Sequence, residues 1–239
     1  MIQGQNRQEI IEVLYEDNHV IVVNKNASDI VQGDKTGDVT LPDKIKEYLK
    51  IKYDKPGNVF CGVVHRLDRP TSGVVLFAKT SKALSRLNEQ FRSKDTLKIY
   101  WAVVENAPKT LSARLENFLW KNEKQNKSYI HSSDQKGAKK AILTYQTILK
   151  SDNYTLLEVA LETGRHHQIR VQLSHIGSII KGDVKYGAKR SNQDGSIHLH
   201  ARKLRFIHPT TKELITVEAP VPNDPLWSWF QSEMTRKLK

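Results

Sequence analysis

One carboxylate, that of Asp68, lies between the basic residues Arg66 and Arg69 in the segment 65–73. Turn-forming residues follow the second arginine, and the apolar run 74–78 is typical of a buried strand. An opposite charge within a few ångströms favours the ionised form of a carboxyl group. An ionised, oriented carboxylate in a basic protein is a candidate nucleophile for an anionic substrate. The alternative is a structural turn, with Asp68 capping it and paired to a neighbouring arginine.

A second polar cluster follows Gly164, which can end a strand with a tight turn. Arg165, His167 and Arg170 would then lie at the start of a helix, whose free N–H groups and dipole favour anions. The alternative is a solvated basic helical turn. The adjacent pair of His166 and His167 also suggests a metal site. We expect none, because no nearby cysteine or third ligand completes it and neighbouring helical residues point in different directions.

The composition narrows the choice of partner. The chain has 239 residues, of which 38 are Lys or Arg and 26 are Asp or Glu, for a net charge of +12. Such an excess favours a polyanionic partner, most simply nucleic acid bound through its phosphates. An anionic membrane surface is the competing partner, but no lysine-rich amphipathic helix with a clean apolar face is evident.

The sequence favours the cytoplasm and no membrane span. Cys61 is the only cysteine, so one chain can form no internal disulfide, which suits a reducing compartment. The segment 1–7 lacks the apolar core of a signal peptide. No apolar run approaches the length that crosses a bilayer.

Strand patterns dominate the chain. They predict strands at 10–15, 20–24, 73–79, 97–104, 141–149, 155–161, 199–206 and 214–219, and a hairpin at 111–130 with a lysine-rich tip at 121–127. Helical spacing predicts helices at 42–53, after Ser81 as N-cap, and at 167–174, with a short apolar segment at 226–230. No linker or repeat interrupts this order. We therefore expect one mostly antiparallel α+β domain over 1–239, with two lobes and a cleft between them.

Five motifs occur in an order that identifies a family: 15–25, 65–73, 98–104, 164–171 and 199–209. Together they resemble the RluA family of pseudouridine synthases, which isomerise uridine in ribosomal and transfer RNA. One short motif would be weak, but five in the family's order over most of the chain are specific. The resemblance implies a mostly antiparallel mixed sheet flanked by helices, a central catalytic cleft, and no cofactor or metal.

Two local departures from the family pattern lie beside the expected cleft. Lys25 is followed by Asn26, Ala27 and Ser28 where the family usually has Pro-Ala-Gly, and His166 replaces a usual threonine. Because both departures lie beside the cleft and not at Asp68, they bear on which substrate fits the site more than on the type of reaction. Many members also carry a small N-terminal RNA-binding domain. Only a short segment precedes the first predicted strand, so we expect that domain to be absent.

The resemblance also implies roles for three residues. Pseudouridine formation breaks the bond from ribose C1′ to uracil N1, turns the base, and joins C1′ to C5. Asp68 would be the catalytic carboxylate, which either attacks the sugar or base or assists departure of uracil. Arg170 would pair with it. Tyr100 would stack on the flipped base, and its hydroxyl could help take the C5 proton, although its ordinary pKa near ~10 favours stacking. Without the family, Tyr100 could equally be a core residue.

The remaining candidates would contact the substrate. Arg66 lies two residues before Asp68, so both point the same way on an extended segment, and it could fill the place of the extruded base. The other candidate substrate-binding residues are Arg165, His167, Ile169, Lys25, Lys121, Lys124 and Lys127. The three hairpin lysines could instead be a solvated loop tip. Asp183 is expected to belong to a structural turn rather than to act as a second acid.

The expected function is therefore a monomeric pseudouridine synthase that flips a uridine out of a ribosomal or transfer RNA stem-loop. One rival is an RNA-binding module with the same fold and no activity. The other is a nucleoside or glycoside hydrolase, which usually needs two carboxyl groups facing one bond. The combination of Asp68, Tyr100 and Arg170 favours the synthase over both.

Overall fold

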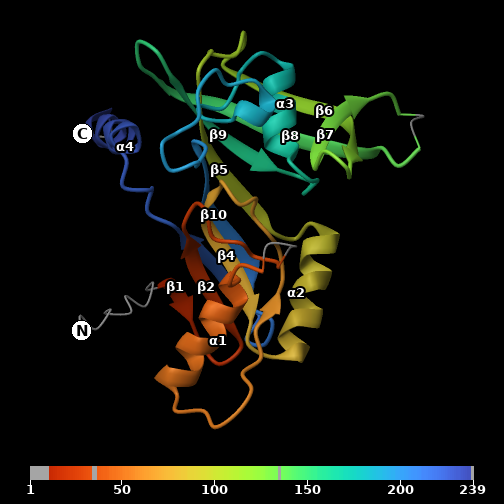
Figure 1. Cartoon of the computed structure of the whole chain (residues 1–239), viewed down its shortest axis with the longest axis vertical. Helices are drawn as coiled ribbons and strands as arrows, with labels where there is room; N and C mark the ends of the chain where they lie inside the picture. Colours follow the sequence, from red (N-terminus) through yellow and green to blue (C-terminus); the bar gives the residue numbers. More distant parts are fainter. Residues whose placement is uncertain (1–10, 34–36, 134–135, 238–239) are drawn as a thin grey trace.

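An eleven-stranded sheet runs the length of the molecule (Figure 1). The computed structural model describes residues 11–33, 37–133 and 136–237. The strand order is β1-β2-β4-β10-β5-β9-β8-β6-β7, with β3 paired to β4 and β11 paired to β10. Within the described ranges the pairs are antiparallel except for β4 and β10, which run parallel over two residue pairs. The predicted α+β class with a mostly antiparallel sheet is confirmed.

The elements follow in chain order. The first half of the chain holds β1 (Glu12–Glu16), β2 (Val20–Lys25), α1 (Leu41–Lys52), β3 (Gly62–Val63), β4 (Ser72–Ala78), α2 (Ser81–Ser93), β5 (Leu97–Val104) and β6 (Ser112–Asn122). The second half holds β7 (Lys127–His131), β8 (Lys139–Lys150), β9 (Thr155–Leu161), α3 (Gln168–His175), the 3-10 helix η1 (Val184–Tyr186), β10 (Leu199–Ile207), β11 (Leu214–Glu218) and α4 (Pro225–Lys237).

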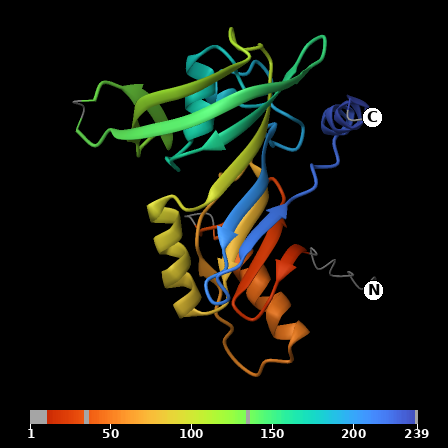
Figure 2. The same cartoon turned by 180° about the vertical axis from the view of Figure 1, so that it is seen from behind.

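Two lobes share the sheet. The lower lobe in Figure 1 contains β1, β2, β4 and β10 with α1 and α2, and the upper lobe contains β6 to β9 with α3. Strand β5 continues from one lobe into the other, which is also clear from behind in Figure 2. Because β5 pairs with β10 on one side and β9 on the other, the relative placement of the lobes is set by backbone hydrogen bonds.

Helices cover both faces of the sheet. Ile45 of α1 and Ile169 of α3 pack in one core cluster with alternate residues of β2, β4, β5 and β9. Leu87 of α2 packs in a second cluster, and Trp227 of α4 packs in a third. The alternation of side chains along each strand sends neighbouring residues to opposite clusters. As a result, α1 and α3 lie on one face, and α2 and α4 lie on the other.

Most predicted elements are present, with shifts at their ends. The predicted N-cap of α2, Ser81, is wrong by one residue: Thr80 has the extended backbone and accepts a hydrogen bond from the N–H of Ala83 (3.1 Å). The apolar segment 226–230 belongs to a helix that extends over Pro225–Lys237. Residue 10, in the first predicted strand, lies outside the described residues. None of the helices described is long and apolar enough to cross a bilayer.

Strand β4 is buried over its whole length, from Ser72 to Ala78. The start of the strand requires a glycine. Gly73 has a φ of +114°, which residues with a side chain rarely adopt. A Cβ there would lie 2.3 Å from the backbone oxygen of Ala201 in β10. The close approach of β4 and β10 therefore requires the absence of a side chain at residue 73.

Replacing Gly73 by alanine will lower the free energy of unfolding by about 3 kcal/mol or more, because positive φ and a backbone clash act together. Urea denaturation measures the change. Gly164→Ala is the matched control, since an added Cβ at residue 164 would meet nothing within 4 Å and the φ of Gly164 is ordinary. Equal stability of the two variants would contradict the packing of β4 on β10.

Candidate active site

Asp68 lies in the connection between β3 and β4, and three hydrogen bonds and one ring contact fix the chain around it. Nε2 of His65 accepts a hydrogen bond from the N–H of Leu76 (3.0 Å), and the His65 ring stacks on Phe91. The N–H of Thr71 donates to the carbonyl oxygen of Asp68 (3.0 Å), which closes a turn. The ammonium group of Lys25 donates to the carbonyl oxygen of Thr71 (2.7 Å). The carboxylate is thus presented from a rigid loop.

Arg170 joins two carboxylates. Its Nε and Nη2 atoms donate to the two carboxylate oxygens of Asp183 at 2.7 and 2.8 Å, and its Nη1 donates to Oδ2 of Asp68 at 3.0 Å. The Arg170 side chain is 4% exposed and that of Asp183 is 1% exposed. Burial alone would lower the pKa of Arg170, but Asp183 and then Asp68 raise it overall. The bidentate pair fixes the guanidinium plane, and its remaining edge holds Asp68.

Tyr100 reaches the same place from β5. Its side chain is nearly buried, and burial followed by the charge of Asp68 raises the pKa of its hydroxyl group. A raised pKa means that the phenol stays protonated at neutral pH and is not available as a general base. The ring remains available as an apolar surface on which a planar group can stack.

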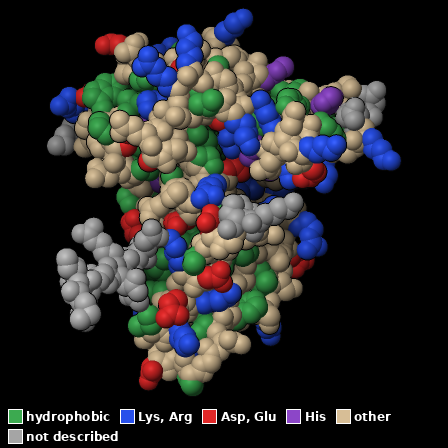
Figure 3. Space-filling view, in the orientation of Figure 1, with side chains coloured by type: hydrophobic (Ala, Val, Ile, Leu, Met, Phe, Trp, Pro, Cys, Tyr) green, Lys and Arg blue, Asp and Glu red, His purple; other side chains and the backbone are tan. Residues whose placement is uncertain are grey.

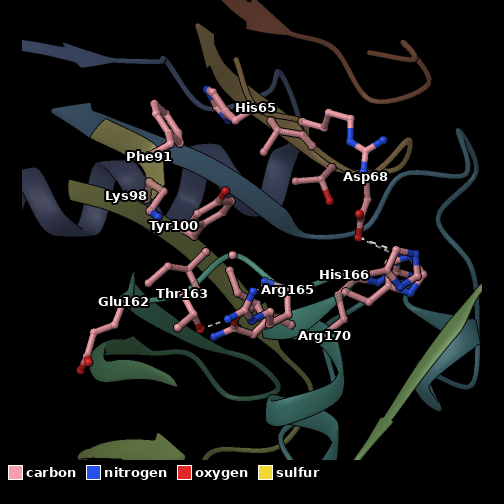
Figure 4. Close-up of a pocket in the computed structure, with 18 of the residues that line it drawn as sticks. His65, Asp68, Phe91, Lys98, Tyr100, Glu162, Thr163, Arg165, His166 and Arg170 are labelled. Atoms are coloured by element: carbon pink, nitrogen blue, oxygen red, sulfur yellow. Dashed lines mark hydrogen bonds and ion pairs between the residues drawn. The ribbon is translucent and has the colours of Figure 1, made fainter. Parts of the chain in front are cut away.

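These side chains line one cavity of about 560 Å³, within the usual range for ligand sites. Figure 4 shows Asp68, Tyr100 and Arg170 converging on it from the β3–β4 connection, β5 and α3. The sequence analysis missed several other residues that line the cavity: His65, Leu67, Phe91, Arg92, Lys94, Lys98, Thr163 and Leu199. Phe91, Arg92 and Leu199 come from α2 and β10, which approach the cavity only in the folded chain, whereas His65 and Leu67 lie in the same segment as Asp68.

Two histidines form a stacked pair at one wall of the cavity. The ring centroids of His166 and His167 lie 3.7 Å apart. Oγ of Ser128 donates to the carbonyl oxygen of His166 at 2.7 Å and lies 2.9 Å from its Nδ1. Burial lowers the pKa of both rings, with the charge of Arg170 adding to the effect at His167, where the pKa falls to about 2. Both rings are therefore neutral near pH 7. No cluster of potential metal ligands occurs among the described residues.

Four predicted substrate contacts line the cavity, and one of them, His167, is described above. Arg66 and Arg165 are exposed at its rim, and Ile169 is a buried part of its wall. The guanidinium of Arg66 donates to Oε1 of Gln32, and Nε of Arg165 donates to the carbonyl oxygen of Lys140 (3.0 Å). Both arginines retain further N–H groups that can reach an anion.

The three predicted lysines lie on the hairpin of β6 and β7 and do not line the cavity. Lys121 forms an ion pair with Glu123 (2.6 Å), and Lys124 is exposed at the tip. The ammonium group of Lys127 lies over the ring of Tyr186, 5.1 Å from its centroid. Figure 3 shows Lys and Arg side chains on the hairpin side of the upper lobe and along the boundary between the lobes. The hairpin thus extends the basic surface beyond the cavity.

The structure corrects the prediction that Lys25 contacts substrate. Its side chain is fully buried, and its ammonium group donates to the carbonyl oxygens of Asn26, Arg69 and Thr71 at 2.8, 3.1 and 2.7 Å. Burial also lowers its pKa to about 8. Lys25 therefore stabilises the backbone that follows Asp68 through these hydrogen bonds. Ser28, in the unusual segment that follows, has a φ of +81°, which a glycine would adopt without strain.

Comparison with known proteins identifies the family. The model of the RNA pseudouridylate synthase family matches residues 19–175. The chain belongs to the RNA pseudouridine synthases. It is 32% identical over 216 residues to an uncharacterised RNA pseudouridine synthase of Synechocystis, covering 89% of this chain and 66% of that protein. It is 33% identical to the ribosomal large subunit pseudouridine synthase D of Zymomonas mobilis, covering 90% and 70%. The chain thus spans about two thirds of the length of these relatives.

The fold of this pseudouridine synthase also has a solved counterpart. Human RNA pseudouridylate synthase domain containing 4 superposes with a TM-score of 0.77 and 22% identity, covering 93% of both chains. Relatives named ribosomal large subunit pseudouridine synthase C and D confirm the resemblance to the RluA-type family. The synthase C of Buchnera aphidicola is 34% identical over 219 residues, and the match covers 89% of this chain and 68% of that relative.

The neutral ring of His65 will make this loop sensitive to acid. Burial, and to a lesser degree Lys98, lowers the pKa of His65 from 6.5 to about 3 in the folded chain. The unfolded chain therefore binds the proton first, and stability falls as the pH drops from 7 towards 3. His65→Gln keeps an acceptor for Leu76 but cannot titrate. Between pH 7 and 5 the wild type should lose about 1 to 2 kcal/mol more of unfolding free energy than this variant.

Urea unfolding at the two pH values measures this difference. His131→Gln, which removes an exposed histidine, is the control and should follow the wild type. If His65→Gln shows the same pH dependence as the wild type, His65 is not held neutral in the folded chain.

Proposed function

We propose that this protein converts uridine to pseudouridine in ribosomal RNA, with Asp68 as the catalytic carboxylate. The observation that carries this is the ion pair between Asp68 and Arg170 at a cavity that Tyr100 also lines. The choice of ribosomal RNA is supported by the relatives named after the large ribosomal subunit. The sequence also suggests transfer RNA as a substrate. The pseudouridine mapping described below tests both kinds of RNA.

The reaction needs no external reagent. The bond from C1′ to N1 breaks, the uracil rotates, and C1′ bonds to C5. The proton that C5 then loses is balanced by the proton that N1 gains. Asp68 acts at the reacting nucleotide, and Tyr100 offers its ring as a surface for the rotating base. A stacked uridine must first leave the helix, which costs a few kcal/mol. Phosphate contacts by the basic surface offset part of that cost.

The surroundings of the other acids argue against glycoside hydrolysis. Asp183 is buried, holds Arg170 through both oxygens, and does not line the cavity. Glu162 does line the cavity, but its carboxylate is paired with Arg114 (3.0 Å). Among the described residues the cavity thus offers Asp68 without a second free carboxyl group facing it, whereas hydrolysis of a glycosidic bond usually uses two.

Asp68→Asn is the direct test of the activity. It keeps the size of the side chain and removes the negative charge, so pseudouridine formation should fall by at least about 1000-fold, as expected for loss of a nucleophile or its equivalent. The measurement is mapping of pseudouridine in purified ribosomal and transfer RNA after incubation with each protein. Full activity of the variant, or release of free uracil by the wild type, would contradict the proposal.

The hairpin lysines are proposed to contact RNA phosphates outside the cavity. Neutralising a phosphate releases counterions, so each contact adds about 0.7–0.9 to the slope of log affinity against log salt. Replacing Lys121, Lys124 and Lys127 together by alanine should make that slope shallower by about two units, with the rate at saturating RNA nearly unchanged.

Filter binding between low and moderate salt measures the slope. The matched control replaces Lys46, Lys50 and Lys55 on and after α1, at the far end of the lower lobe, and removes the same charge. Equal slopes for the two triple variants would show that the hairpin is only a solvated tip.

A further inference from the structure

His167 occupies an unusual position for a helix N-cap. Its side chain makes no capping hydrogen bond, and its φ is +53°, in the left-handed region. Histidine is tolerated there better than most residues, yet such a backbone persists only where its surroundings fix it. The residue is only 8% exposed. Since its ring is also neutral, His167 offers no positive charge to an anionic substrate, and its contacts indicate another role.

The contacts of the Tyr186 hydroxyl group favour one position for the proton of the His167 ring. This hydroxyl accepts the N–H of Ser128 at 2.9 Å and has one proton of its own to donate. Two acceptors are near: Nδ1 of His167 at 2.9 Å and the carbonyl oxygen of Ser128 at 3.3 Å. The shorter contact is with Nδ1. Donation to Nδ1 leaves the proton of the neutral imidazole on Nε2.

The opposite side of the ring supports the same tautomer. Nε2 of His167 lies 3.6 Å from Oδ2 of Asp68. A bare Nε2 would face a carboxylate oxygen with its lone pair, which is repulsive, whereas Nε2–H is attracted to it. The distance is longer than a hydrogen bond, but such contacts between active-site groups shorten when substrate is bound.

We propose that His167 is a positioning residue: Tyr186 holds it as the Nε2–H tautomer, and this N–H directs Oδ2 of Asp68 away from the reacting nucleotide. Arg170 already donates to the same oxygen at 3.0 Å. Two donors on Oδ2 leave Oδ1, which has no hydrogen-bond partner among the described residues, as the oxygen that can act at the cavity that Asp68 lines. This inference rests on the proposed role of Asp68, and it adds which carboxylate oxygen reacts and what selects it.

A pair of substitutions separates this role from simple packing. In His167→Asn the amide oxygen takes the place of Nδ1 and accepts the hydrogen bond from Tyr186, and asparagine suits a positive φ, but no donor reaches Asp68. In His167→Gln the longer side chain places an amide N–H near the position of Nε2. We expect kcat on RNA to fall at least about tenfold in the Asn variant with KM within about twofold, and the Gln variant to recover most of the loss.

Both variants are compared with the wild type by urea unfolding before the kinetics. Wild-type kcat in the Asn variant would overturn the proposal, as would equal loss in two variants of equal stability. If the wild type makes no pseudouridine at all, the proposed function fails instead, and the tautomer measurement below still decides the geometry.

The tautomer has its own spectroscopic signature. Nitrogen-15 NMR of labelled imidazole distinguishes a protonated nitrogen from a bare one. We expect protonated Nε2 and bare Nδ1 for His167 near pH 7, and a shift of the population towards Nδ1–H in Tyr186→Phe. A wild-type ring with its proton on Nδ1, or one unaffected by loss of the Tyr186 hydroxyl group, would contradict the proposal.

Discussion

The guanidinium group of Arg170, held between two carboxylates, is the interaction on which the site depends. The two carboxylate oxygens of Asp183 accept hydrogen bonds from Nε and Nη2 of Arg170 in a buried bidentate pair. This pair sets the plane of the guanidinium group and leaves Nη1 directed at Asp68. A buried ion pair of this kind adds little net stability, because desolvation offsets most of the attraction. Its value lies in orientation. The carboxylate of Asp68, the proposed catalytic group, is held by a guanidinium whose plane Asp183 fixes, and the proposed contact with His167 acts on the same oxygen.

The fold explains why three distant segments can meet with such precision. Asp68 and Arg170 are 102 residues apart in sequence, and they meet because β4 pairs with β10, β10 with β5, and β5 with β9, which leads directly into the turn before α3. Gly73 allows β4 to approach β10. Lys25 and His65 then fix the backbone on either side of Asp68. A core that covers both faces of the sheet supports this frame, so the loop that carries Asp68 is anchored at both ends.

Local patterns in the sequence were enough for the class of fold and for the residues around Asp68. The alternation in the strands and the regular spacing of α1 reflect burial on one face, which the sequence displays. Depth is different. Lys25 is a cation in the segment 15–25, and its neighbours in sequence do not show that β2 is buried. Nor do they show that carbonyl oxygens surround the ammonium group of Lys25. Asp183 was predicted to be part of a turn, which it is, but its bond to Arg170 depends on how η1 packs against α3. Phe91 and Lys98 reach the cavity only because α2 and β5 lie beside it.

The most direct test of this account is the rate of pseudouridine formation under single-turnover conditions in Arg170→Lys. Lysine keeps the positive charge but cannot bind Asp183 through two parallel hydrogen bonds while holding Asp68. The account predicts a rate lower by about 100-fold, or about 2.7 kcal/mol in the barrier, with RNA affinity within about twofold of the wild type. A wild-type rate in this variant would show that charge alone is sufficient, and that the fixed orientation of Asp68 is not what the structure is built to provide.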